Sequence, residues 1–321
     1  MADAPKTAVV IPSWNSLALL PRCLDSLAQQ RLELEILVVD NGSGDGTLDY
    51  LQREDVPHLS LPRNVGFARA VNLGSARVQA PFVLALNADT VLEPGAVQAL
   101  VEALEAEQEL GGVQPRILQL TEEGRDPATA RLYSAGQALT RDGRAIELGA
   151  GEAQSPRYLS GGEIFGVCGA ACLLRRELFD HLGGYDERYF SFYEDVDLNL
   201  RGRIAGWGFA YVPEAVVWHV GNAAWMAQAP RPTAWNARLV ARNRLATQLK
   251  FLPASAWPRV AAVELGALAR AASERRFFAT LRGKLEALGW LPAMLRERRR
   301  LGTEGELARA RRWLGSTEEE A

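Results

Sequence analysis

The sequence has few of the residues on which several protein classes depend. Only three of its 321 residues are cysteines, Cys23, Cys168 and Cys172. No secretory signal is recognisable at the N-terminus, so we expect a reducing compartment. Cys168 and Cys172 share one apolar stretch that lacks the further His or Cys partners of a zinc site. We therefore expect them to be buried packing residues.

Long apolar runs and an excess of one charge are also missing. Because no run of 18 uncharged apolar residues occurs, we expect no membrane-spanning segment. A formal net charge of −3 gives no support for nucleic-acid binding. The charge is unevenly distributed, however. Residues 258–313 hold 13 Lys and Arg against 6 Asp and Glu, a net charge of +7 that leaves −10 for the rest. The C-terminal part is chemically distinct.

Strands alternate with helices in the N-terminal half. Apolar runs predict strands at 7–14, 34–40 and 82–89 and a short edge strand at 58–64. Helical spacing predicts helices at 17–30, 45–54, 66–78 and 95–107. This alternation indicates an α/β protein with a doubly wound, mostly parallel sheet. Ligands bind such sheets beyond the carboxyl ends of the strands.

The second half is less regular. Residues 119–163 are polar and rich in glycine, which predicts a hairpin and a long functional loop. Strands are expected near 167–175 and 209–221, with helices between them. From about residue 226 the pattern is helical. We therefore predict one α/β domain at 1–225 and a basic, amphipathic helical extension at 226–321.

Acidic residues follow two of the predicted strands. Asp40 precedes Gly42, Gly44 and Gly46, whose spacing differs from that of a dinucleotide-binding loop. Asp40 could cap the following turn or accept a hydrogen bond from a nucleobase N–H. Asp89, in Asn87-Ala88-Asp89, could likewise cap a turn or bind Mg²⁺ or Mn²⁺ at a diphosphate.

Three further groups of polar residues require an interpretation. Glu194 and Asp195 begin a predicted helix behind an aromatic run. Capping of this helix would account for one of the two acids, and a functional role is the alternative, whereas Asp197 is expected to pair with Arg201. His219 follows an apolar strand, where the pattern by itself favours a core histidine over a metal ligand. Residues 242–244, Arg-Asn-Arg, lie on a predicted helix, whose simplest interpretation is a solvated basic face.

In this order, the motifs resemble those of family 2 glycosyltransferases with the GT-A fold, most of all the bacterial rhamnosyltransferase-like members. The resemblance covers roughly residues 6–250. The segments that carry it are VVIPSWN, LEILVVDNGSGDGT, RNVGFARAVNLG, VLALNADT, the long stretch from GACLLRRELF to VVWHVG, and RNRL.

The resemblance implies a role for each candidate residue. Asp40 corresponds to the acid that recognises the nucleoside base, and Asn87-Ala88-Asp89 to the metal-binding motif, with Asp89 as its ligand. His219 stands where several relatives have a further metal ligand. Asp195 corresponds to the catalytic base, with Glu194 beside it in a supporting role. The nucleotide-sugar-binding residues expected besides these are Pro12, Ser13, Trp14, Arg63, Asn64 and Gly66.

The implied function is that of an inverting, metal-dependent glycosyltransferase with Mg²⁺ or Mn²⁺. The donor would be dTDP-rhamnose or a UDP-sugar, and the acceptor a hydroxyl of a saccharide or lipid-linked precursor of a polysaccharide or glycolipid. A nucleotidyltransferase is disfavoured because the Gly/Arg/Lys-rich N-terminal loop expected of it is missing. A catalytically inactive nucleotide-sugar-binding module is the non-enzyme alternative.

The basic C-terminal helices suggest a location as well. Helices with apolar and basic side chains can lie on anionic membrane surfaces. A helical cap packed on the catalytic domain or an oligomer contact, such as a homodimer, are the alternatives. We expect a cytoplasmic protein, with the inner face of the cell membrane as a candidate site of action.

Overall fold

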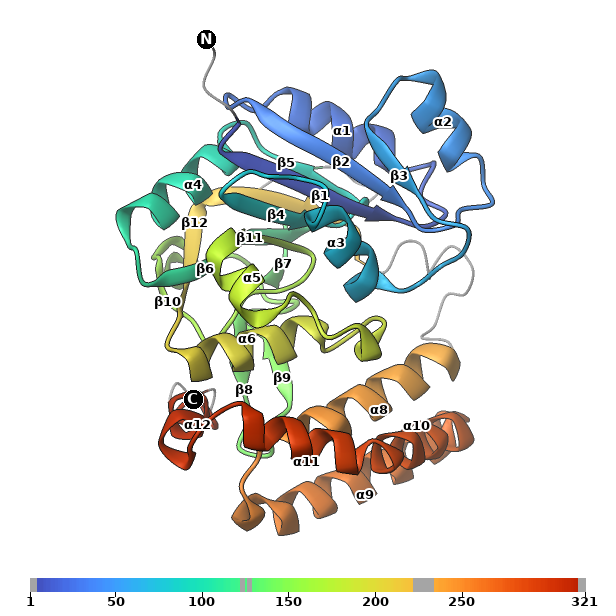
Figure 1. Cartoon of the computed structure of the whole chain (residues 1–321), viewed down its shortest axis with the longest axis vertical. Coiled ribbons are helices and arrows are strands. Elements are labelled where there is room, and N and C mark those ends of the chain that lie inside the picture. Colours follow the sequence, from blue (N-terminus) through green and yellow to red (C-terminus); the bar gives the residue numbers. More distant parts are fainter. Residues whose placement is uncertain (1–4, 122–124, 126–128, 222–233, 317–321) are drawn as a thin grey trace.

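The structure is a computed structural model that describes residues 5–121, 125, 129–221 and 234–316. A mixed sheet lies in the upper part of Figure 1, and the C-terminal helices form a layer below it. The sheet has the strand order β10-β12-β6-β11-β4-β1-β2-β3. The prediction of an α/β fold with a mostly parallel sheet and a C-terminal helical region is confirmed.

The first part of the chain alternates as predicted. Its strands are β1 (Thr7–Ser13), β2 (Leu34–Asp40), β3 (His58–Ser60), β4 (Phe82–Leu86) and β5 (Thr90–Leu92). Its helices are α1 (Leu20–Ala28), α2 (Thr47–Arg53), α3 (Phe67–Ser75) and α4 (Ala96–Ala106). Strands β1, β2, β3 and β4 pair in parallel, so β1, β2 and β4 end at the same edge of the sheet.

The middle of the chain completes the sheet. It contains β6 (Leu110–Gln119), β7 (Leu132–Ser134), β8 (Gln137–Leu139), β9 (Ala145–Glu147), β10 (Gly162–Glu163), β11 (Ala171–Arg175), α5 (Arg176–Leu182), α6 (Glu194–Ala205) and β12 (Gly208–His219). Strand β11 runs antiparallel to both β4 and β6. Strands β8 and β9 form a separate hairpin within the region predicted to be a hairpin and loop.

Strand β6 was absent from the sequence-based prediction, although it lies inside the sheet. It contains Gly111, Gly112 and Pro115, residues that usually argue against a central strand. A Cβ atom at Gly112 would lie 2.8 Å from the side chain of Leu174. Pro115 lies beside a register shift between β6 and β12. Close packing and this irregularity therefore explain the glycine and the proline.

Both faces of the sheet are covered. In β1, Val9 and Ile11 belong to an apolar cluster with α1, α2 and α4, whereas Ala8 and Val10 belong to a cluster with α3, α5 and α6. This alternation follows from the two-residue period of a strand. A sheet buried on both faces leaves its strand ends as the place for polar side chains.

The C-terminal helices are α8 (Ala234–Phe251), α9 (Trp257–Ser273), α10 (Phe277–Gly289), α11 (Leu291–Arg300) and α12 (Glu304–Arg311). Helix α12 packs on α6, where Leu307 and Ala310 share an apolar cluster with Val196 and Leu200. The domain boundary predicted at 225/226 lies outside the described residues.

Candidate active site

A cavity of about 400 Å³ opens where β1 and β4 end. Its wall combines the strand ends, the β8–β9 hairpin, the segment before α6 and the end of β12. Most of the predicted site residues line it: Pro12, Ser13, Trp14, Asn64, Gly66, Asn87, Ala88, Asp89, Glu194, Asp195 and His219. Asp40 and Arg63 are not part of this wall, and the side chain of Arg63 is exposed.

Asp40 lies behind the turn that follows β1. It pairs with Ser13 in the parallel register of β1 and β2 and is 1% exposed. Its Oδ1 has no hydrogen-bond partner among the described residues. A buried carboxylate oxygen of this kind is costly unless a donor reaches it. The turn-cap interpretation of Asp40 thus leaves this oxygen unexplained, whereas an incoming N–H group would satisfy it.

Asn41 anchors the segment that contains Asn64 and Gly66, two of the predicted nucleotide-sugar-binding residues. Its Nδ2 donates to Asn64 Oδ1 at 3.1 Å, and its Oδ1 accepts from the Val65 N–H at 2.8 Å. Gly66 has a φ of +91°, and a Cβ there would lie 2.7 Å from the ring of Phe190. The glycine is required because both the backbone angle and the space exclude a side chain. Asn41 was not among the predicted site residues.

Asn87, Asp89 and His219 converge at the end of β4. His219 pairs with Thr90 in the β5–β12 register, which brings its ring beside the preceding residue, Asp89. His219 Nε2 lies 3.1 Å from Asp89 Oδ1 and 3.2 Å from Asn87 Nδ2. The edge of the Tyr133 ring packs against the imidazole, with ring centroids 4.5 Å apart. His219 is buried, but it points to a carboxylate rather than into an apolar core. A carboxylate oxygen and an imidazole nitrogen in one wall of a cavity suit a divalent metal ion.

Asp195 is held by hydrogen bonds at the start of α6. Its Oδ2 accepts from the Gly169 N–H and from Gln137 Nε2, both at 2.9 Å. Its Oδ1 accepts from the Val196 N–H at 2.8 Å. Burial raises the pKa of Asp195 above its usual value, and these hydrogen bonds oppose the rise. A fixed carboxylate of raised basicity is a suitable proton acceptor.

Glu194 differs from its neighbour. Burial, followed by the charge of Asp195, raises the pKa of Glu194 well above its ordinary value. Its Oε2 has no hydrogen-bond partner in the described part of the chain. Of the two adjacent acids, Asp195 is therefore the one with its carboxylate stabilised and oriented. The expected pair of Asp197 with Arg201 is confirmed at 2.7 Å.

The segment before α6 has an unusual backbone. Phe190, Phe192 and Tyr193 have φ angles of +66°, +70° and +69°, which bulky residues rarely adopt. Asn243 on α8 donates to the carbonyls of Tyr189, Ser191 and Phe192 at 2.7–2.9 Å. These bonds can hold the strained conformation in place. Asn243 is fully buried, so the interpretation of residues 242–244 as a solvated face is wrong for it.

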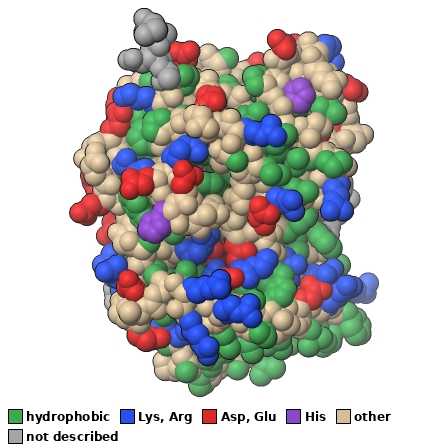
Figure 2. All heavy atoms as spheres, viewed as in Figure 1, with side chains coloured by type: hydrophobic (Ala, Val, Ile, Leu, Met, Phe, Trp, Pro, Cys, Tyr) green, Lys and Arg blue, Asp and Glu red, His purple; other side chains and the backbone are tan. Residues whose placement is uncertain are grey.

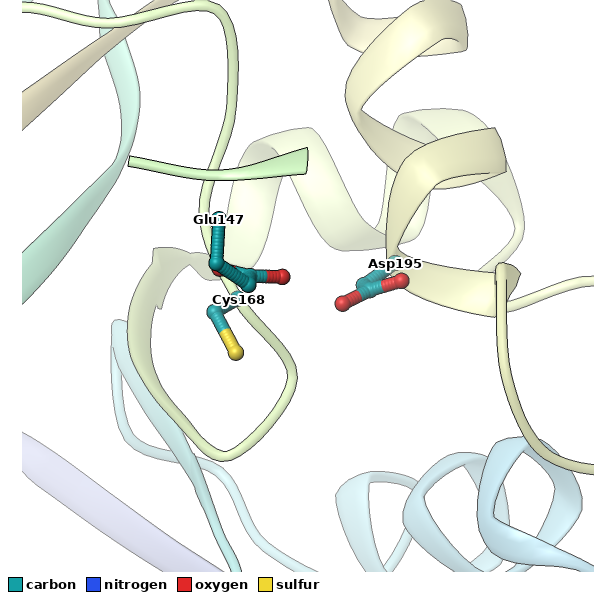
Figure 3. A group of neighbouring side chains, drawn as sticks. All are labelled: Glu147, Cys168 and Asp195. Carbon is teal, nitrogen blue, oxygen red and sulfur yellow. The ribbon is translucent and has the colours of Figure 1, made fainter. Parts of the chain in front are cut away.

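The β8–β9 hairpin contributes a second carboxylate that the sequence reasoning missed. Glu147 Oε2 accepts from Ser134 Oγ at 2.6 Å, and its Oε1 accepts from Gln137 Nε2 at 3.0 Å. Figure 3 shows the carboxyl groups of Glu147 and Asp195 facing one another, with Cys168 beside Glu147. The ligand atoms of these three residues lie within 4.8 Å of one another. A site spread over residues 147, 168 and 195 has no spacing motif that could reveal it.

This cluster is a weaker candidate metal site than Asp89 and His219. Both oxygens of Asp195 already accept hydrogen bonds. Burial raises the pKa of the Cys168 thiol well above its usual value, whereas metals bind the thiolate. Cys168 and Cys172 are buried, as expected, and Cys23 is buried as well.

A family comparison agrees with this geometry. The model of the family described as "Glycosyl transferase family 2" matches residues 8–183, more than half of the chain. The chain belongs to glycosyltransferase family 2.

Among curated relatives of this family 2 glycosyltransferase is the N-acetylglucosaminyl-diphospho-decaprenol L-rhamnosyltransferase of Mycobacterium tuberculosis. The two are 35% identical over 218 residues, which is 60% of this chain and 68% of the relative. A PGL/p-HBAD biosynthesis glycosyltransferase of Mycobacterium bovis is 29% identical over 205 residues, 62% of this chain and 70% of the relative. The resemblance to rhamnosyltransferase-like members is confirmed.

Solved structures support the fold. The mannosyltransferase PcManGT of Pyrobaculum calidifontis, in complex with GDP-Man and Mn²⁺, has a TM-score of 0.52 and 18% identity, covering 96% of this chain and 86% of that one. GalNAc-T7 with UDP, GalNAc and Mn²⁺ has a TM-score of 0.54 and 17% identity, covering 67% of this chain and 43% of that one. At such identities the similarity concerns the fold.

Proposed function

We propose that this glycosyltransferase is an inverting, metal-dependent enzyme that moves a sugar from a nucleotide-diphosphate donor to a hydroxyl group. The observation that carries the proposal is one cavity whose wall contains Asp89 and His219 together with Asp195. A donor diphosphate and an acceptor hydroxyl need these two kinds of group at once. An inactive binding module would need no oriented base.

The nucleoside end would lie at the turn after β1. The unpartnered Oδ1 of Asp40 is the group we assign to a nucleobase N–H, with Pro12, Ser13 and Trp14 beside it. Because Asp40 itself is not part of the cavity wall, the base would have to enter beside this turn. Asn64 and Gly66, tied to Asn41, would support the nucleotide from the other side.

Asp89 and His219 would hold the divalent cation, Mg²⁺ or Mn²⁺, with Asn87 as a weaker contact. Such an ion would supply Lewis-acid stabilisation of the charge that develops on the diphosphate leaving group. The His219 Nε2 to Asp89 Oδ1 distance of 3.1 Å lets both side chains reach one ion with little movement. Asp89 lies at a strand tip, outside the apolar core, so a charge can be held there.

Asp195 would accept the proton of the acceptor hydroxyl during attack. The Gly169 N–H and Gln137 Nε2 fix Oδ2, so the carboxylate is oriented before the acceptor arrives. Direct attack from the face opposite the diphosphate inverts the anomeric centre, and no covalent sugar–enzyme intermediate is required. Glu194, whose raised pKa favours its protonated form, would support the acceptor or the loop.

We propose dTDP-rhamnose as the preferred donor and a lipid-linked sugar diphosphate as the acceptor. The support is the similarity to a relative named as an N-acetylglucosaminyl-diphospho-decaprenol L-rhamnosyltransferase. UDP-sugars are the alternative donors. The test is a panel of dTDP-, UDP- and GDP-sugars with Mg²⁺ or Mn²⁺ and a short-chain polyprenyl-diphospho-N-acetylglucosamine. Product with the inverted anomeric configuration supports the proposal. If none of the nucleotide sugars is consumed, either in the presence or in the absence of the acceptor, the proposal is rejected.

The C-terminal helices suggest how such an acceptor is reached. Within the described residues, no helix combines the length and apolarity needed to cross a membrane. Exposed apolar side chains nevertheless gather on α9, α10 and α11: Leu265, Phe278, Leu285, Leu288 and Leu295. Exposed arginines occur in the same segment of the chain: Arg259, Arg270, Arg275, Arg296 and Arg299. Figure 2 shows Lys and Arg side chains over the lower part of the molecule, with hydrophobic side chains along its lower edge.

We call these ten side chains the C-terminal patch and propose that it contacts an anionic membrane surface. The four acids between residues 257 and 300, Glu264, Glu274, Glu286 and Glu297, are each paired with an arginine or lysine side chain. The surface is therefore apolar and cationic, the combination that anionic lipid headgroups attract. Membrane contact at these helices would bring a lipid-linked acceptor to the catalytic domain.

A further inference from the structure

A single amide group lies between the two carboxyl groups of the acidic pair. Gln137, in β8, is 2% exposed. Its Nε2 donates to Asp195 Oδ2 at 2.9 Å and to Glu147 Oε1 at 3.0 Å. The two acids come from α6 and β9, so this side chain joins the start of the helix to the hairpin. Both acids line the same cavity.

The direction of the Gln137 amide is fixed by its other end. Asn199 Nδ2 donates to Gln137 Oε1 at 2.9 Å and to the Val167 carbonyl at 2.8 Å. Because Oε1 meets a donor, Nε2 must face the acids. Asn199 follows Asp195 by four residues on α6, so both side chains lie on one face of the helix. A Cβ at Gly166 would collide with the Asn199 side chain, so the glycine leaves Asn199 its place.

We propose that Gln137 is a positioning residue for the base: one amide group, oriented by Asn199, holds Asp195 and Glu147 as a single acidic unit at the acceptor end of the cavity. The inference rests on the proposed function, because Asp195 is a base only if the enzyme transfers a sugar. It assigns roles to two residues of the hairpin, Gln137 and Glu147, that contribute to the site from far away in the sequence.

The electrostatics of the pair agree with this arrangement. Burial, and then the charge of Asp195, raises the pKa of Glu147 to about 7, while hydrogen bonds from Ser134 and Gln137 oppose the rise. The Gln137 hydrogen bond likewise opposes the raised pKa of Asp195. Because the charge of Asp195 contributes to the raised pKa of Glu147, the two ionisations are coupled and belong to the pair.

Other titratable groups face the pair from neighbouring elements. Glu194 adjoins it on α6, Cys168 lies in the loop before β11, and Tyr133 lies in β7. Tyr193 adjoins it at the N-terminus of α6. Burial is the largest cause that raises the pKa of each of these four groups. Burial therefore favours the neutral form of each of these groups.

Two variants should shift the pH dependence of kcat in opposite directions. Gln137→Leu removes the hydrogen-bond donor that stabilises both carboxylates. The fall of kcat on the acidic side of its pH profile, the acidic limb, should therefore move to higher pH by about one unit. At neutral pH, kcat should then fall about tenfold, with the donor KM within about twofold. Glu147→Gln removes the ionisation of Glu147, so the limb near pH 7 should disappear and activity should persist to lower pH.

Gln119→Leu is the matched control, because Gln119 Nε2 donates to the Leu132 carbonyl on β7 at 3.3 Å and not to either acid of the pair. It should lower the melting temperature without moving the pH limb. If Gln137→Leu behaves like this control, or if Glu147→Gln leaves the limb in place, the positioning role is rejected.

A titration of ¹³C-labelled carboxyl groups by NMR separates this inference from the proposed function. Raised pKa values of Glu147 and Asp195 in Gln137→Leu are expected. If they are seen in a protein whose wild type transfers no sugar, the proposed function fails and the base role fails with it. If the wild type transfers sugar but the carboxyl pKa values are unchanged in Gln137→Leu, only the positioning role fails.

Discussion

His219 Nε2 lies 3.1 Å from Asp89 Oδ1, although 129 positions separate the two residues in the sequence. Strand β12 brings the imidazole to the residue that follows β4, through its pairing with β5. Both side chains line the cavity, and the first two predictions below concern the chemistry of that cavity.

Asp89→Ala should abolish sugar transfer and leave the fold intact, since Asp89 lies at a strand tip. We expect a loss of at least about 10²-fold in kcat, because the stabilisation of the leaving diphosphate is lost. His219→Ala should weaken the metal dependence less completely. The measurement is turnover of chelator-treated protein against added Mg²⁺ or Mn²⁺. Wild-type turnover by Asp89→Ala under these conditions would exclude the metal role, and a His219→Ala effect limited to the melting temperature would make His219 a structural residue.

Asp195→Asn should reduce transfer by at least about 10²-fold while donor binding survives. The amide keeps the size of the side chain but cannot accept the hydroxyl proton. Glu194→Gln should cost less, because we assign Glu194 a supporting role and its raised pKa already favours the neutral form that glutamine mimics. Both variants are compared at saturating donor, with donor affinity followed by thermal shift. An inactive Glu194→Gln beside a normal Asp195→Asn would mean that the base is Glu194.

Lys250→Met should destabilise the protein by about 3–5 kcal/mol, because it leaves the buried Asp197 carboxylate with only part of its compensation. Lys250 Nζ lies 2.6 Å from Asp197 Oδ1 and 3.1 Å from Glu297 Oε2, so this one side chain ties α8 to α6 and α11. Denaturant titration measures the loss. Glu54→Gln, which removes an exposed pair with Arg53, is the control and should cost less than about 1 kcal/mol. Equal losses of unfolding free energy in the two variants would show that the buried ion pair contributes no more to stability than the exposed pair does.

The same pair predicts a loss of stability in acid. Burial alone would raise the pKa of Asp197, but the charges of Lys250 and Arg201 lower it below its usual value. A carboxyl group whose pKa is lower in the folded state stabilises the protein above its unfolded pKa of about 4. That contribution is lost as the pH falls below about 4 and through the folded pKa. Asp197→Asn should flatten the dependence of the unfolding free energy on pH in this window. An unchanged slope would rule out Asp197 as its source.

The C-terminal patch should bind vesicles that contain anionic lipid. Combined Phe278→Asp and Leu285→Asp should reduce co-sedimentation about tenfold or more, because both exposed side chains would lose their contact with lipid. Binding should also weaken at high salt, since part of the attraction is electrostatic. Leu159→Asp is the control, because Leu159 is similarly exposed but lies outside the patch. Absence of wild-type binding at low salt would leave a protein contact as the role of the patch.

The sequence by itself determined the parts of the molecule that depend on local pattern. Apolar runs and helical spacing predicted most strands and helices, and the acidic residues after β2 and β4 marked the ligand edge of the sheet. Strand β6 was not predicted from the sequence, because its glycines and proline contradict the local pattern of a strand. Those residues make sense only beside Leu174 and the register shift with β12.

The tertiary structure decided which distant side chains meet. Sheet register places His219 beside Asp89, and the β8–β9 hairpin brings Glu147 and Gln137 to Asp195. Asn243 on α8 supports the backbone before α6 across a gap of about fifty residues. The physical reason is that a buried polar group must find its partner in three dimensions. Local spacing shows which groups are polar, but only the packing of elements shows which of them are paired.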